Sequence, residues 1–161
     1  MNMNSTRIRP DSTDNPQVGK YRHNLYKAVM AQYNKALKKG YYIESVSLIE
    51  SIISDRLESL ANKISGTKRY SYKTLGELLK YLKKPHSFSS PMMQALNDID
   101  VWRENRNQAI HEMAKLDNAE TDFTEKYNKI KEYAEEGMLL FRLIDNHITK
   151  YLKHTPKTIQ Q

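Results

Sequence analysis

The spacing of apolar residues constrains the fold of this chain more than any other feature, because they recur three and four positions apart along most of it. The two longest runs extend from Val46 to Ile64 and from Tyr127 to Tyr151, and the second resembles a coiled-coil seam. Such spacing places side chains on one face of an α-helix, whereas strands alternate between faces. With only five glycines and five prolines in 161 residues, the sequence predicts an all-α protein without a large sheet.

Residues that end and start helices divide the chain into a compact bundle of about five helices. Gly40 and Gly66 are expected to end the first two, because glycine readily adopts the left-handed conformation that follows a helix. Thr74 and Glu77 have the spacing of a capping box ahead of a short third helix, which stops before Pro85.

The fourth predicted helix begins where Ser90 can act as the cap and Pro91 can take the first helical position, and it runs to about Leu116. The last apolar run forms the fifth helix, whose seam needs a partner helix from the same chain or from another subunit. We expect one helical domain at 20–152, after a flexible polar arm at 1–19 and before a C-terminal tail, residues 153–161.

The chain is strongly basic, with 26 Lys and Arg against 19 Asp and Glu and a formal net charge of +7. This charge suggests a polyanionic partner such as nucleic acid, although lysines at helix C-termini also offset the helix dipole. The lack of cysteine excludes disulfides, thiolate zinc sites and thiol nucleophiles. Because no segment has the length of an apolar membrane span or the apolar centre of a secretory signal, we expect a cytoplasmic protein with no membrane partner.

The segment WRENRNQAIHE interrupts the apolar face of the fourth predicted helix with charged and polar groups. On a helical wheel of about 100° per residue, Arg106 lies at the centre of that face and Arg103 about 60° from it. Asp100, Asn107 and His111 follow at about 100° to 140° and form a polar border. One helix therefore combines an apolar surface with groups that hold charge and transfer protons.

Arg106 needs a partner if it is buried, because an unpaired guanidinium is costly to remove from water. Glu50 is the obvious internal candidate, since it lies about 40° from Val46 within the apolar stripe of the second helix. A Glu50–Arg106 or Glu50–Arg103 ion pair can serve only to fix the helix register. Alternatively, Arg106 faces a polar groove and acts on a ligand, with Arg103, Glu50 and Asp100 in supporting roles.

Metal-independent cleavage of RNA needs the kinds of group that this helix carries. The 2′-hydroxyl attacks the adjacent phosphate, so protons must move near neutral pH and negative charge develops on a phosphorane. A histidine such as His111 can take or give those protons, and the planar fork of Arg106 can hold two phosphate oxygens. Asn107, one turn before His111, can orient the imidazole or the phosphate.

The residues RNQAIH, Arg106 to His111, resemble the R-x(4–6)-H signature of HEPN domains, helical bundles that include many metal-independent ribonucleases. Members of this family often carry Asn directly after the Arg, and Asn107 matches. The resemblance covers residues 20–152 in helix order, but only six residues match the motif. A second match, Arg142 to His147, lacks the Asn and lies off the apolar seam, so we interpret it as incidental.

The resemblance implies an endoribonuclease of a toxin–antitoxin or phage-defence system that needs no metal and no cofactor. It implies Arg106, His111 and Asn107 as the catalytic residues. It also implies a homodimer, because the two motifs of such dimers meet at the subunit interface and share one cleft. The expected partners are RNA and a cognate antitoxin, of the nucleotidyltransferase type or another. The alternatives are a catalytically inactive HEPN-like module that binds RNA, a nucleotide or a partner protein, and an ordinary basic bundle.

The loop between the second and third predicted helices is the predicted RNA-contact segment. Its aromatic rings can stack on bases, and its cations can neutralise phosphates. These side chains are Lys68, Arg69, Tyr70, Tyr72 and Lys73. The histidines other than His111 stand alone without metal-ligand spacing, so no metal site is predicted.

Overall fold

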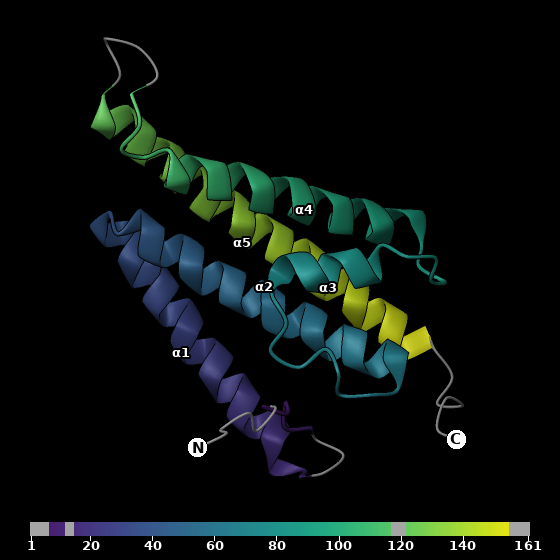
Figure 1. The fold of residues 1–161 in the computed structure, drawn as a ribbon. Helices are drawn as coiled ribbons and strands as arrows, with labels where there is room; N and C mark the ends of the chain where they lie inside the picture. Colours follow the sequence, from purple (N-terminus) through teal and green to yellow (C-terminus); the bar gives the residue numbers. More distant parts are fainter. Residues whose placement is uncertain (1–6, 12–14, 117–121, 155–161) are drawn as a thin grey trace, which may run out of the picture.

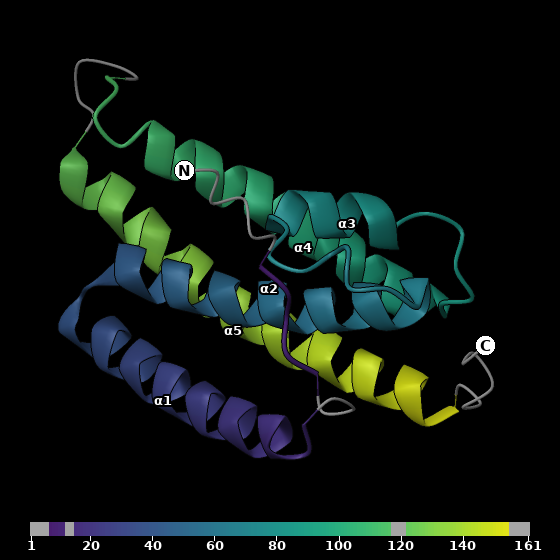
Figure 2. The same ribbon diagram turned by 60° about the horizontal axis from the view of Figure 1, so that its bottom comes forward.

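The all-α prediction is confirmed by the computed structural model, which describes residues 7–11, 15–116 and 122–154. Five helices lie in this described part of the chain (Figure 1). They are α1 (Gln17–Lys39), α2 (Tyr42–Ser65), α3 (Leu75–Leu82), α4 (Ser90–His111) and α5 (Phe123–His154). α2 packs against α1, α3 and α5, while α4 packs against α5 and α3. The short α3 therefore lies against both α2 and α4, on the side away from α1 (Figure 2).

Three helices meet closely at Gly137 of α5. A Cβ at this position would lie 2.7 Å from Trp102 Cζ2 of α4 and 3.0 Å from Ile49 Cγ2 of α2, so glycine lets the helices meet. The indole Nε1 of Trp102 donates a hydrogen bond of 2.9 Å to the carbonyl oxygen of Tyr133. These contacts fix the rotation of α4 about its axis one turn before Arg106.

The local signals for helix ends correspond to the observed boundaries. Gly40 and Gly66 follow α1 and α2 with φ values of 79° and 65°, in the left-handed region. Thr74 and Glu77 form the expected capping box at the start of α3. The cap of α4 is Ser89 rather than Ser90, and its side chain accepts a hydrogen bond from the backbone N–H of Met92.

α4 ends at His111, five residues before the predicted end near Leu116. The apolar pattern that continues to Leu116 is not buried, since this side chain is 76% exposed. The ammonium group of Lys126 in α5 donates a hydrogen bond of 2.8 Å to the carbonyl oxygen of Glu112. A cation from the next helix thus satisfies the carbonyl just past the end of α4 and favours termination there.

Part of the predicted N-terminal arm packs against the bundle. α1 begins at Gln17, three residues before the predicted domain start, where the Asn15 side chain accepts a hydrogen bond of 2.9 Å from the Gln17 N–H. Arg9 is buried between the carboxylates of Asp55 and Glu58 on α2. The apolar spacing in the sequence does not indicate this contact, because it involves a single ion-paired side chain. Residues 1–6, 12–14 and 155–161 of the predicted arm and tail lie outside the described residues.

Candidate active site

The buried face of α4 determines where its charged residues point. Arg106 lies within this face and is only 9% exposed, as its position on the helical wheel suggested. The apolar residues that share the face are Met92, Ala95, Leu96, Ile99 and Trp102. Because α4 is a single uninterrupted helix, the directions in which its other polar residues point are determined by the burial of this face.

The guanidinium of Arg106 forms an ion pair with Glu50 of α2. The structure thus contains one of the two Glu50 pairs that the sequence suggested, and it is the pair with Arg106. The guanidinium carbon also lies 5.5 Å from the ring centre of Trp102, within the range of a cation–π interaction. Glu50 remains partly open to solvent, with 28% of its side chain exposed against 11% for Arg106. The pair therefore lies at the edge of the core.

Burial of the Arg106 guanidinium is only partly compensated. Burial lowers the pKa of Arg106 below its usual value, and the nearby Glu50 carboxylate offsets part of that effect. An arginine side chain still remains protonated, since its reference pKa is far above neutral. The Nε–H group is buried and has no hydrogen-bond partner in the described structure. An unsatisfied buried donor is unfavourable and uncommon, so this site carries a cost that packing alone does not explain.

Asn107 and His111 lie further along α4, toward its C-terminal end. His111 is the last residue of the helix and is exposed, while Asn107 is half-buried. Within the described chain, neither side chain forms a hydrogen bond or ion pair with the other or with Arg106. A single copy of the chain therefore places the three residues on one helix without joining them in a closed site.

Arg103 and Asp100 do not join the Glu50–Arg106 pair. Arg103 donates hydrogen bonds to Asp100 Oδ1 from Nε at 3.0 Å and from Nη2 at 2.7 Å. Lys83, which follows α3, forms an ion pair with the other carboxylate oxygen. Burial alone would raise the pKa of Asp100, but the hydrogen bonds and charges of Lys83 and Arg103 outweigh it and lower that pKa. These residues connect α4 to α3, whereas Arg106 connects α4 to α2.

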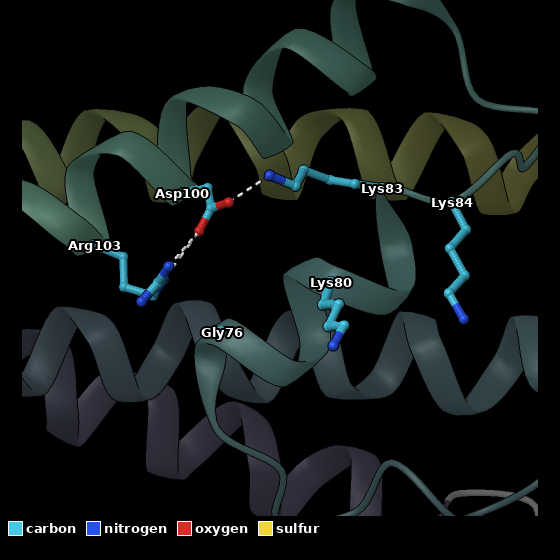
Figure 3. Close-up of a pocket in the computed structure, with 6 residues that line it drawn as sticks. All are labelled: Gly76, Lys80, Lys83, Lys84, Asp100 and Arg103. Atoms are coloured by element: carbon cyan, nitrogen blue, oxygen red, sulfur yellow. Dashed lines mark hydrogen bonds and ion pairs between the residues drawn. The ribbon is translucent and has the colours of Figure 1, made fainter.

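A hollow of about 460 Å³ lies where α3 meets α4. The residues that line it are Gly76, Lys80, Lys83, Lys84, Asp100 and Arg103 (Figure 3). In the sequence, KYLKKPH reads equally well as a solvated helix end, so this site was not predicted. The available signal was the group of three lysines at the end of the short helix, with Lys80 on the helix and Lys83 and Lys84 directly after it.

The predicted RNA-contact loop is only partly available to a ligand. The ring of Tyr70 stacks on that of Tyr81 at a centroid distance of 4.0 Å, and Arg69 lies over Tyr70 at 4.9 Å. Tyr72 is 57% exposed, and its backbone N–H donates to Glu58 Oε2 at 2.7 Å. Tyr72 is therefore the more exposed of the two tyrosines, but the guanidinium of Arg7 lies over its ring at 5.2 Å from the centroid.

Of this loop's lysines, Lys73 forms an ion pair of 3.2 Å with Glu77, the residue of the capping box. Lys68 also has an interaction within the structure. The predicted cations of the loop thus have intramolecular contacts of their own, in contrast to some of those in the hollow between α3 and α4.

The described residues provide neither a metal site nor a membrane span. No group of three or more histidine, aspartate or glutamate side chains is arranged there to hold a metal ion. None of the described helices combines the length and the apolar character that crossing a membrane requires.

Comparisons with known proteins assign no family to the chain. No protein-family model, no curated protein and no solved structure matches the chain.

Proposed function

We propose that this protein is a metal-independent endoribonuclease whose active site forms between two copies of the chain. The observation that carries the proposal is the burial of Arg106 in the apolar face of α4, paired with Glu50, on the helix that ends at the exposed His111. The arginine and the histidine belong to the segment that resembles the HEPN motif. The natural setting we propose is a toxin–antitoxin or phage-defence system with a cognate antitoxin.

In the proposed reaction, RNA supplies its own nucleophile. A general base takes the proton of the 2′-hydroxyl, the O2′–P bond forms, the P–O5′ bond breaks, and a general acid protonates O5′. The products are a 2′,3′-cyclic phosphate and a 5′-hydroxyl end. Because two proton transfers occur on opposite sides of the phosphorus, a dimer with two copies of His111 can supply both.

Arg106 is proposed to stabilise the phosphorane. A guanidinium has five N–H donors, and the ion pair with Glu50 uses the Nη2 group, so donors remain for phosphate oxygens. Glu50 holds the fork in place before the substrate arrives, and such preorganisation is the main source of electrostatic catalysis. Asn107 is proposed to orient the imidazole or the phosphate from the turn between them.

The dimer is supported by apolar side chains that a single copy leaves exposed. Leu139 and Leu143 of α5 are 65% and 43% exposed and lie one turn apart, and Val101 of α4 is 57% exposed. His111 is exposed in a single copy, so its imidazole is accessible to an RNA strand and to a second copy of the chain. Light scattering at micromolar concentration should give twice the mass of the chain, and a monomer would argue against the shared site.

The decisive experiment incubates the purified chain with RNA in EDTA. The wild type should cleave, and His111→Ala should lower the rate by about 10²-fold or more, the usual contribution of a general acid or base. The chain offers a matched control in the second motif match, since His147 is also five residues after an arginine but lies on α5. His147→Ala should cleave like the wild type, and equal rates for all three proteins would overturn the proposal.

An inactive RNA-binding module is the second candidate, because the Glu50–Arg106 pair can also fix the register of α2 and α4 without any reaction. The same experiment separates the two, since a module would bind RNA without cleaving it. Expression gives an independent result. A toxin should slow bacterial growth and His111→Ala should relieve it, whereas equal growth of both strains would argue against a toxin.

A further inference from the structure

The hollow between α3 and α4 has an unbalanced positive charge. Four cationic side chains and one carboxylate line it, which leaves a formal charge of +3 within about 460 Å³. The carboxylate, Asp100, already binds Lys83 and Arg103. Lys80 and Lys84 form no hydrogen bond or ion pair in the described part of the chain. Like charges gathered in this way repel one another and favour binding of an anion.

The arrangement separates two kinds of cation. Figure 3 shows Lys83 extended toward Asp100, whereas the amines of Lys80 and Lys84 point away from that carboxylate. Asp100 therefore holds Lys83 and Arg103 in fixed positions, while the other two lysines remain able to bind a ligand. The phosphates of a nucleic-acid strand combine the negative charge and the acceptor oxygens that such a cluster binds.

Gly76 provides the space for this cluster. A Cβ at Gly76 would lie 3.5 Å from Cζ of Arg103, in van der Waals contact, so a larger side chain would occupy the hollow. The guanidinium of Arg103 thus lies close to α3 at Gly76.

The hollow lies on the same side of α4 as two residues of the proposed active site. Arg103, Asn107 and His111 are four residues apart and lie along one side of α4. At a helical rise of 1.5 Å per residue, Arg103 and His111 are separated by about 12 Å along the axis. A stacked strand rises about 3.4 Å per nucleotide, so this distance corresponds to about three or four nucleotides.

We propose that the Lys80–Lys84–Arg103 hollow binds a backbone phosphate of the RNA strand and directs that strand along α4 toward His111. The direction of the strand toward His111 rests on the proposed ribonuclease function, whereas the binding of a phosphate in the hollow does not. The hollow is then a substrate-positioning site, and the phosphate it holds is a few nucleotides from the one that is cleaved.

Binding is best measured with a fluorescent 2′-O-methyl oligouridylate of about ten nucleotides, which lacks the attacking hydroxyl and cannot be cleaved. The Lys80→Gln/Lys84→Gln variant removes two cations at exposed positions, so its melting temperature should match the wild type. Each phosphate contact to a single strand contributes about 0.7 to the slope of log affinity against log salt. This variant should therefore lose at least about tenfold in affinity and about 0.7 in slope, because the hollow is proposed to hold one phosphate.

The matched control is Lys35→Gln/Lys39→Gln in α1, which removes the same charge at the same spacing. It should change affinity by less than about threefold and leave the slope unchanged. Gly76→Gln fills the hollow without changing its charge, and it should weaken binding as well. Equal losses in the two lysine variants would show only nonspecific attraction and would overturn the proposal, as would full binding by Lys80→Gln/Lys84→Gln.

Two further measurements identify the class of ligand and separate the hollow proposal from the ribonuclease proposal. Uridine monophosphate should not displace the strand at comparable concentration, and displacement would assign the hollow to free nucleotides instead. If the wild type binds through the hollow but never cleaves RNA, the ribonuclease proposal fails and the hollow stands. If it cleaves RNA with a KM that Lys80→Gln/Lys84→Gln leaves unchanged, the hollow fails and the ribonuclease proposal stands.

Discussion

Two arginines of α4, three residues apart, illustrate how position changes the role of the same side chain. Arg106 is buried against Trp102, its main partner is a carboxylate on α2, and its Nε–H has no partner in the described structure. Arg103 is half-exposed, its hydrogen bonds go to neighbours on its own helix, and it lines an open hollow beside α3. Fixing Arg106 in the core costs free energy, because its Nε–H has no partner. Arg103 is instead held by ion pairs with residues of its own helix and remains close to solvent. We therefore assign stabilisation of the transition state to the first and guidance of the strand to the second.

The largest expected difference between the two arginines is in catalysis. Arg106→Ala should lower kcat for RNA cleavage by about 10² to 10³-fold, the usual loss when a preorganised group at the reacting centre is removed. Arg103→Ala should instead raise KM by about tenfold with little change in kcat, because it removes one cation from strand binding. Single-turnover kinetics with a short RNA would measure both. Equal effects on kcat would remove the distinction between the two side chains.

The next largest difference between Arg106→Ala and Arg103→Ala should be in the stability of the fold. Arg106→Ala leaves Glu50 without its partner at the edge of the core, so the free energy of unfolding should fall by about 3 kcal/mol. Arg103→Ala should cost at most about 1 kcal/mol, as expected for ion pairs near the surface. Urea denaturation of both variants measures these changes. If Arg106→Ala loses activity with little loss of stability, a purely structural role is excluded, whereas a loss of stability alone supports the ordinary bundle.

The packing of Trp102 beneath Arg106 can be tested without changing any charged residue. Gly137→Ala would place a methyl group 2.7 Å from Trp102, the ring on which Arg106 lies, so overpacking should cost about 1 to 3 kcal/mol. Gly19→Ala in α1 is the control, because nothing lies within 4 Å of a Cβ there. It should be neutral or slightly stabilising, since alanine is the better helix former. Thermal melting would compare the two, and equal stability would show that the contact at Gly137 relaxes freely.

The smallest expected effect concerns pH and the Arg103 side of the helix. The folded pKa of Asp100 is lowered, so its contribution to stability is complete above its unfolded pKa, near 3.8, and is lost as the pH falls through the lower folded value. Asp100→Asn should therefore remove up to about 1 kcal/mol at neutral pH, and this difference from the wild type should shrink below about pH 4. Denaturation at a series of pH values measures it. A difference that persists unchanged in acid would exclude ionisation of Asp100 as its source.

The parts of the fold that depend on neighbouring residues could be predicted from the sequence. The left-handed glycines after α1 and α2 and the Thr74–Glu77 capping box are set by local chemistry, and each is present. The burial of Arg106 followed from helix rotation, because an apolar face must point inward whatever its partner is. Rotation also made Glu50 a candidate partner but left Arg103 and Arg106 as alternatives, and the structure contains the pair with Arg106.

The remaining features depend on which elements meet in space, and periodicity carries no such information. The hollow exists because α3 lies against α4, a contact between elements that the sequence joins only through a loop. The buried Arg9 likewise depends on where the arm crosses α2. The end of α4 coincides with a hydrogen bond from a lysine of α5, a contact that its own apolar pattern does not indicate.

The most direct test of the shared active site is a crystal structure of the full chain with an uncleavable 2′-deoxy dinucleotide. A shared site requires a dimer in which an imidazole of His111 and the guanidinium of an Arg106 both lie within about 3 Å of atoms of one phosphate. A structure in which every His111 ring faced bulk solvent, out of reach of the phosphate and of either guanidinium, would rule out the shared site.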